Sequence, residues 1–260
     1  MMSTPWKGCF FSLLWVGSFN LLAEPATPAC QQGIHILYHE RIPYMQLTPR
    51  GITGLTASVV SDAFQLAGVN TVWKEIPPKR QLQRIKSDRP CECALGWFKT
   101  PERERYAKYS LPIYQDKPQV ALVKSSNYQF TDGQTLPEVL SNPNLKLLVR
   151  DGYSYGQFID EKLRQYHPST KKVAYDNFKM LELIYYRRYD YFFIAPEEIK
   201  KLIQASAFQY QDFKSISFSD IPHGEKRYLI CGMGVPDRIL QALNQTLTDT
   251  DQYGSLEFSH

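Results

Sequence analysis

The stretch that decides the fold is GWFKTPERERYAKYSLPIY, at residues 96–114. An apolar run at residues 93–98 ends in Gly-Trp-Phe, and a turn, a short charged segment and a second apolar run follow it. A strand that stops at Trp97 and Phe98 places large aromatic faces at its carboxyl end. In open α/β sheets that end is where ligands bind. The stretch therefore predicts a binding site at a strand end.

Just beyond this strand end, Thr100 is suited to cap a helical turn with Pro101 at its first position, where a missing N–H has no cost. Arg103, one turn further on, is then expected to return a guanidinium to the same edge of the sheet. Aromatic faces beside a fixed fork of donors suit a small ligand that carries a carboxylate. The alternative for Arg103 is a surface arginine within the charged run at residues 102–105.

Composition and charge bound the class of protein. The chain has 260 residues, of which 43% are hydrophobic and 22% charged, as in ordinary globular proteins. Without Lys7, 29 basic residues stand against 26 acidic ones, which leaves a net charge near +3. Because this net charge is small and the charged residues are dispersed along the chain, we expect no nucleic-acid partner.

The first 23 residues have the pattern of a secretory signal peptide. Lys7 is their only charge, and a mainly apolar run from residue 8 to Ala23 follows it. An uncleaved membrane anchor is the alternative, although the run is shorter than the roughly 20 residues of a spanning helix. A lipoprotein site ending at Cys30 is a further alternative, far beyond the apolar run. We expect an exported protein.

Four cysteines remain after residue 23. Cys91 and Cys93 followed by the single distant Cys231 lack the paired spacing of a zinc site, so neither a metal nor a cofactor is expected. If the strands that begin near Ile34 and Cys91 are parallel neighbours, Cys30 and Cys91 lie at their amino ends and are positioned to pair. Four buried thiols are the alternative.

Apolar patterning predicts strands and helices that alternate in two similar halves. In the first half, strands are expected at 34–38, 71–76 and 93–98, and helices at 55–67 and 78–85. In the second, strands are expected at 119–124, 145–149, 173–175 and 191–195, and helices at 156–165 and 178–188. A glycine-containing strand at 228–235 and a final helix complete the chain. This is an α/β pattern with two lobes and a hinge.

Six short motifs follow one another in an order that resembles the periplasmic solute-binding proteins of bacterial family 3, which serve amino-acid ABC importers. The resemblance extends from about residue 34 to residue 253. The motifs are IPYM at 42–45, GITGL at 51–55, TPER at 100–103, YSLPIY at 109–114, RYD at 188–190 and CGMG at 231–234.

The resemblance implies a type II periplasmic binding-protein fold, in which two mainly parallel sheets flanked by helices are joined by a two-segment hinge. The expected division is a signal peptide at 1–23, a first lobe at 31–120 plus 231–260, and a second lobe at 121–230. It also implies a periplasmic monomer, exported across the inner membrane of a Gram-negative bacterium. Such a protein captures a small carboxylate-bearing ligand, an amino acid or a related organic acid, and delivers it to the permease of an ABC importer without being an enzyme.

The resemblance also assigns the site. Arg103 occupies the position of the family's carboxylate clamp, and Ser154 matches a hydroxyl-bearing position on the second lobe. The expected ligand-binding residues are Gly96, Trp97, Phe98, Arg103 and Tyr44 on the first lobe and Tyr153, Ser154 and Asp190 on the second. One departure concerns Ala195, which stands where amino-acid-binding relatives usually have the acid that holds the ligand's ammonium. Glu197 or Glu198, on the helix that follows, is an alternative for this role, and Glu40 and Asp116 are further acids near strand ends. The carboxylate half of an amino-acid site is thus predicted, and the amine half is not.

Three alternative functions remain open. The segment 152–156 is also G-x-S-x-G, the pattern of a hydrolase nucleophile, and Asp190 and His223 follow Ser154 in hydrolase order. Some relatives of the family are dehydratases that act on cyclic carboxylates. A sensory accessory protein, whose closed form contacts a membrane receptor, is the third.

Overall fold

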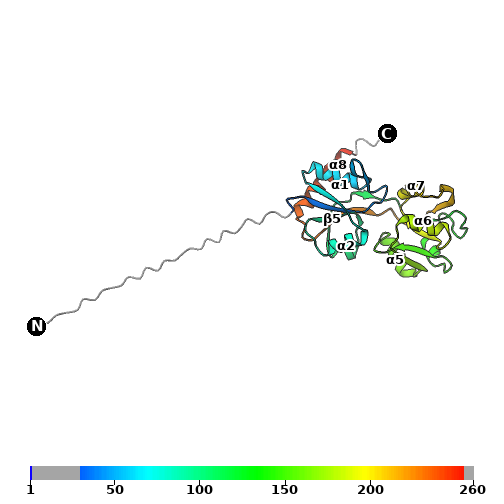
Figure 1. Ribbon diagram of the computed structural model, residues 1–260. Coiled ribbons are helices and arrows are strands. Elements are labelled where there is room, and N and C mark those ends of the chain that lie inside the picture. Colours follow the sequence, from blue (N-terminus) through cyan, green and yellow to red (C-terminus); the bar gives the residue numbers. More distant parts are fainter. Residues whose placement is uncertain (2–29, 255–260) are drawn as a thin grey trace.

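The computed structural model describes Met1 and residues 30–254. They form two lobes, each built on its own sheet (Figure 1). The predicted signal peptide at 1–23 lies outside the described residues. Among the residues that are described, no helix combines the length and apolarity needed to span a membrane.

The first lobe is built on a six-stranded sheet with β5 (Glu92–Phe98) at its centre. The strand order is β4-β1-β5-β13-β6, and β7 also pairs with β13. The strands that flank or extend β5 are β1 (Ile34–Tyr38), β4 (Thr71–Glu75), β6 (Ala107–Tyr109), β7 (Tyr114–Gln115) and β13 (Lys226–Gly232). Every residue of β5 is buried, as expected for a strand covered on both faces.

Helices cover both faces of this sheet (Figure 1). One face packs on α1 (Ala57–Leu66) and α8 (Asp237–Gly254), and the other packs on α2 (Pro78–Lys86). The short α3 (Pro101–Glu104) follows β5 directly. A small hairpin of β2 (Gln46–Thr48) and β3 (Gly51–Thr53) precedes α1.

The second lobe is built on a five-stranded sheet in the order β10-β9-β11-β8-β12. Its strands are β8 (Val120–Lys124), β9 (Leu147–Arg150), β10 (Thr170–Val173), β11 (Tyr191–Ile194) and β12 (Phe213–Ile216). Its helices are α4 (Leu136–Leu140), α5 (Gln157–Tyr166), α6 (Asn177–Tyr185) and α7 (Pro196–Gln204), with the short 3-10 helix η1 (Tyr210–Asp212). A separate apolar cluster covers each face of the sheet.

The chain crosses between the lobes before β8 and again before β13. Residues 226–230, which the sequence pattern assigns to the second lobe, form the start of β13 in the first sheet, and Val120 begins β8 in the second. The charged pair Lys226 and Arg227 hid this strand start from the hydropathy pattern. Arg227 is nevertheless buried, because its charge is paired inside the lobe.

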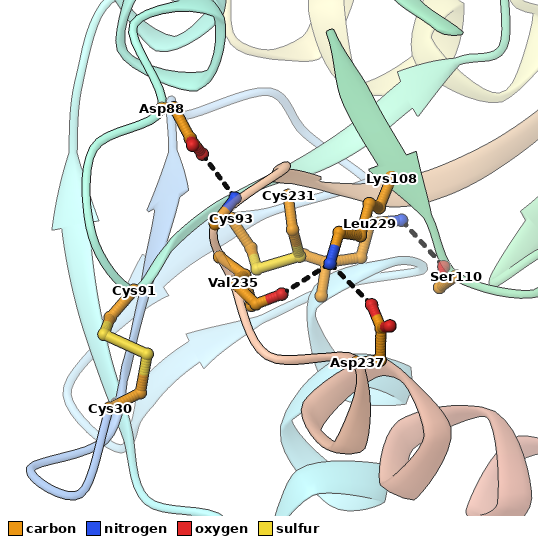
Figure 2. Close-up of a disulfide and its surroundings, with 11 residues drawn as sticks. Cys30, Asp88, Cys91, Cys93, Lys108, Ser110, Leu229, Cys231, Val235 and Asp237 are labelled. Atoms are coloured by element: carbon orange, nitrogen blue, oxygen red, sulfur yellow. Dashed lines mark hydrogen bonds and ion pairs between the residues drawn. A yellow bond between two sulfur atoms is a disulfide. The ribbon is translucent and has the colours of Figure 1, made fainter. Parts of the chain in front are cut away.

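Two disulfides lie at the amino end of β5, both in the first lobe (Figure 2). Cys30 and Cys91, the pair that the sequence favours, are bonded, with their Cα atoms 5.4 Å apart. Cys93 and Cys231 form a second bond between the neighbouring strands β5 and β13, where they are register partners. The sequence pattern did not show this second pairing because it did not reveal that β13 lies beside β5.

Candidate functional site

A cavity of about 40 Å³ lies between the lobes where β5 ends. From the first lobe it is lined by Gly96, Trp97, Phe98 and Arg103, and from the second by Tyr153 and Ser154, so six of the expected site residues meet there. A neighbouring cavity of about 290 Å³ shares Arg41, Arg150 and Asn177 with it. The cavity thus lies at the strand end where the sequence predicts a binding site.

Arg103 is held at the cavity by the local structure that the sequence predicts. Thr100 caps α3, its Oγ1 accepting a hydrogen bond from the Arg103 N–H at 3.3 Å. The residue is only 6% exposed, and its guanidinium donates to the carbonyl oxygen of Phe98 at 2.9 Å and to that of Gly152 on the second lobe at 3.3 Å. It also lies 4.8 Å from the ring centroid of Trp97.

No described acidic side chain forms an ion pair with Arg103. Burial lowers the pKa of its guanidinium below the ordinary value, and the surrounding negative groups offset this only in part. An arginine still carries its charge at neutral pH. A buried cation without a carboxylate partner attracts an anionic ligand strongly, because no acid of the protein balances its charge.

A chain of hydrogen bonds runs from Trp97 across the cleft to Tyr153. The Trp97 indole N–H donates to Gln81 Oε1 at 3.0 Å, which orients the amide so that its Nε2 faces His39 Nδ1 at 3.3 Å. Nδ1 is then an acceptor, so His39 carries its proton on Nε2 and donates to the Tyr153 hydroxyl at 2.8 Å. Burial, with the charges of Arg41 and two further arginines, lowers the pKa of His39 well below its ordinary value, which agrees with a neutral ring.

A second contact between the lobes is an ion pair. Arg41 follows β1 and donates to Glu198 of α7 through Nε at 2.9 Å and through Nη2 at 2.7 Å. The Glu198 side chain is only 3% exposed and also accepts from Asn177 at 3.1 Å. Although burial opposes the charge, the adjacent carboxylate raises the pKa of Arg41.

A third arginine is neutralised within the first lobe. Arg227 on β13 makes two hydrogen bonds to Asp116, at 2.7 and 2.6 Å, and a third to the carbonyl oxygen of Gly96 at 3.0 Å. Its guanidinium lies 3.9 Å from the ring centroid of Tyr44 and 4.7 Å from that of Phe98. Through its bond to Gly96, the pair holds the backbone of β5 near the carboxyl end of the strand.

Arg150 ends β9 and lines both cavities from the second lobe. Its guanidinium lies 4.5 Å from the ring centroid of Tyr153. No described Asp or Glu pairs with it. Arg150 is half-buried, so its charge is only partly exposed to solvent.

The hydrogen-bond donors of the loop before α5 are bonded to carboxylates of the protein itself. Ser154 Oγ donates to Asp160 Oδ2 at 2.5 Å, and the Tyr155 N–H donates to Asp160 Oδ1 at 2.9 Å. The Gln157 N–H donates to Glu225 Oε1 at 2.8 Å. The donors at this helix start, which the resemblance assigned to a ligand, are thus occupied.

Two expected site residues lie elsewhere. Tyr44 is fully buried in the core of the first lobe rather than on the cavity lining, and its hydroxyl has no hydrogen-bond partner among the described residues. Asp190 precedes β11 and accepts hydrogen bonds from the Lys146 N–H at 2.7 Å and from Asn127 at 3.4 Å, in a separate depression of the second lobe. It is the carboxyl end of β11, not this amino end, that reaches the cleft, where the strand is followed by the buried Ala195.

The hydrolase constellation is not assembled. Ser154 Oγ is bonded to Asp160 and accepts from the Gly156 N–H at 3.2 Å. His223 is exposed on the crossing between the lobes, and Asp190 lies in another depression. Because a general base must reach the serine, this arrangement supports no nucleophilic role for it. Within the described residues, no group of three or more His, Cys, Asp or Glu is placed to hold a metal ion.

The sequence pattern did not place His39, Arg41, Arg150 or Arg227 in the site, and it offered Glu198 only as an alternative to the acid missing at Ala195. A signal was present for three of them, since Arg150 is the last residue of a strand and His39 and Arg41 directly follow another. The rule that singled out Arg103 applies to these strand ends too. Arg227 gave no such signal, because only the fold brings it to the cleft.

No family model matches the sequence, and no curated protein is significantly similar to it. Solved structures nevertheless share its architecture. An ancestral arginine-binding protein bound to arginine superimposes with a TM-score of 0.68 at 16% identity, over 86% of this chain and 95% of that one. A histidine kinase sensor domain with similarity to periplasmic binding proteins gives 0.69 at 15% identity, over 88% and 94%. The ancestral amino-acid-binding protein AncCDT-1, a precursor of cyclohexadienyl dehydratase, gives 0.66 at 17% identity, over 86% and 91%. The chain therefore has the two-lobed type II fold of periplasmic binding proteins.

Proposed function

We propose that this protein is a periplasmic solute-binding protein that captures a small carboxylate-bearing ligand between its lobes for an ABC importer. The observation that carries the proposal is the buried guanidinium of Arg103, which faces the cavity between the lobes and has no described acidic partner. Most of the similar structures are binding proteins, including the substrate-binding protein of an amino-acid ABC transporter. The permease of such an importer would recognise the closed form.

Binding is expected to require the lobes to move apart. A cavity of about 40 Å³ is several-fold smaller than the roughly 300–1,000 Å³ of typical ligand pockets. Arg103, His39 and Arg41 all contact the second lobe. A ligand that enters must replace some of these contacts with its own, so closure around it is a shift between two populated states.

We propose binding without turnover. A dehydratase on this scaffold needs a carboxylic acid that reaches the bound compound. Burial raises the pKa of Asp160, but its carboxylate lies behind Ser154 and, among the described residues, no Asp or Glu lines the 40 Å³ cavity. The proposal predicts that the ligand is recovered unchanged.

A thermal-shift screen of amino acids and organic acids tests the proposal, with Arg103→Ala and the exposed Arg50→Ala as a matched pair. A ligand present at 100 times its dissociation constant adds about 2.7 kcal/mol of stability. We expect this shift in the wild type and in Arg50→Ala, and a 10- to 100-fold weaker affinity in Arg103→Ala, as for a lost charge-assisted hydrogen bond. Equal shifts in all three proteins would refute the clamp, and conversion of the compound would favour an enzyme.

A further inference from the structure

The charges around the cavity are unbalanced. Four arginines line it and, among the residues that the structure describes, no aspartate or glutamate does. Two of these arginines are already neutralised, Arg41 by Glu198 and Arg227 by Asp116. Arg103 and Arg150 have no described ion-pair partner, so two positive charges of the cleft have no acid bonded to them. Asp160 is close enough to act electrostatically on Arg103, but its carboxylate is hydrogen-bonded to Ser154 and does not line the cavity.

These two charges come from opposite lobes. Arg103 follows β5 of the first lobe, and Arg150 ends β9 of the second. Each is held against an aromatic ring rather than an acid, Arg103 by Trp97 and Arg150 by Tyr153. The other described residues that line the cavity add no carboxylate, and His39 and Tyr153 are hydrogen-bonded to each other.

Resting on the proposed function, we propose that the ligand is a small dicarboxylate without an ammonium group, with one carboxylate bound by Arg103 and the other by Arg150. Two separated guanidinium groups match two separated carboxylates better than one compact anion. The ligand would also join the lobes electrostatically, which favours the closed form over the open one.

An α-amino acid fits this cleft poorly. Its ammonium would lie beside uncompensated arginines, and like charges a few ångströms apart repel strongly away from bulk water. The acid that could receive it, Glu198, is engaged by Arg41 and Asn177. Glu40 and Asp176 line only the neighbouring cavity, where Lys201 also lies.

Isothermal titration calorimetry on protein produced from the full 260-residue sequence tests the proposal. The ligands are glutarate, pentanoate and glutamate, which differ by one carboxylate or one ammonium on the same five-carbon chain. Succinate, adipate and inorganic phosphate vary the separation of the charges. The proteins are wild type, Arg150→Gln, Arg150→Lys, Arg103→Gln and the exposed Arg50→Gln.

We expect one of the dicarboxylates to bind the wild type at least 30-fold more tightly than the monocarboxylate, glutamate or phosphate. Arg150→Gln should weaken dicarboxylate binding at least 10-fold and leave pentanoate within threefold, whereas Arg103→Gln should weaken both. Arg150→Lys should keep the preference for two carboxylates, and Arg50→Gln should match the wild type. An unchanged unfolding midpoint in Arg150→Gln shows that the loss arises in the cleft.

Three results would overturn the inference and leave the proposed function standing: tighter binding of an amino acid, tighter binding of pentanoate or phosphate, or dicarboxylate binding that is insensitive to Arg150→Gln while Arg103→Gln still weakens it. If no compound of any class binds the wild type, the inference and the proposed function both fail.

Discussion

The inside of the first lobe and the contact between the lobes use the same chemistry in different ways. Arg227 and Asp116 form a two-point ion pair within the first lobe, with side chains 3% and 0% exposed. Arg41 and Glu198 form an equivalent pair, 16% and 3% exposed, but its partners belong to different lobes. When the lobes separate, the first pair stays intact and the second must break.

The first lobe is also the covalently fixed one. Both disulfides of the described residues lie in it, and Cys93–Cys231 joins β5 to β13 at the amino end of β5, the end away from the cavity. The carboxyl end of this cross-linked strand carries Trp97 and Phe98, and Arg103 follows just beyond it. Arg150 and Tyr153 belong to the second lobe. We therefore expect the contacts inside the first lobe to determine the free energy of unfolding, and the contacts between the lobes to change when a ligand binds.

The largest expected effect follows removal of the disulfide between β5 and β13. It closes a loop of 138 residues, for which chain entropy gives a loss of about 5 kcal/mol in the free energy of unfolding. Urea unfolding of Cys93→Ala/Cys231→Ala measures it. Cys30→Ala/Cys91→Ala, with a separation of 61 residues, should lose slightly less, about 4 kcal/mol. If neither pair changes the urea midpoint, the first lobe is not braced by its disulfides.

Breaking the internal ion pair should have the next largest effect. Asp116→Asn leaves the buried Arg227 without its carboxylate, and such a loss costs about 3–5 kcal/mol. The double variant Arg227→Met/Asp116→Leu removes both charges and should recover much of that loss. Equal destabilisation by the single and double variants would show that packing, rather than charge pairing, holds this region.

Breaking the Arg41–Glu198 pair between the lobes should alter the radius of gyration more than the free energy of unfolding. In Glu198→Gln, Arg41 can regain water as the lobes separate, so we expect a smaller loss of unfolding free energy than in Asp116→Asn. Small-angle scattering should show a larger radius of gyration for Glu198→Gln than for the wild type. An unchanged radius in Glu198→Gln, or an expansion of Asp116→Asn just as large, would remove the distinction between the two pairs.

The smallest expected effect is on pH dependence. Because burial and the nearby arginines lower the pKa of His39 below 6.5, the unfolded chain binds a proton at a higher pH than the folded protein does. Stability should therefore fall as the pH drops below about 6.5, by at most about 1.4 kcal/mol per pH unit, and should gain nothing from this group above it. Unfolding at pH 7.5 and pH 5 measures the slope. His39→Gln should flatten it, whereas the exposed His223→Gln should not; equal slopes in both would contradict this role.

The fold was readable from the sequence because its signals are local. The apolar run that forms β5, the cap at Thr100 and the glycines after β13 are each visible within a few residues, and their order gave two lobes. Arg103 and its aromatic neighbours could be predicted for the same reason, since they follow a strand end directly.

The rest of the site depends on contacts that the sequence does not reveal. Arg41 and Glu198 are 157 residues apart, and Arg227 and Asp116 are 111 apart. Tyr44 was misplaced because the motif gave its position in the chain but not that its ring packs beneath Arg227. Asp190 was misplaced because it lies at the amino end of its strand, away from the cleft.

The central claim is that one ligand is held by both lobes at once, and hydrogen–deuterium exchange with and without the best ligand of the calorimetric series tests it most directly. We expect slower exchange in two segments together, residues 96–103 of the first lobe and residues 150–156 of the second, and no such protection in Arg103→Gln at the same ligand concentration. Protection confined to one lobe, or located away from both segments, would contradict it.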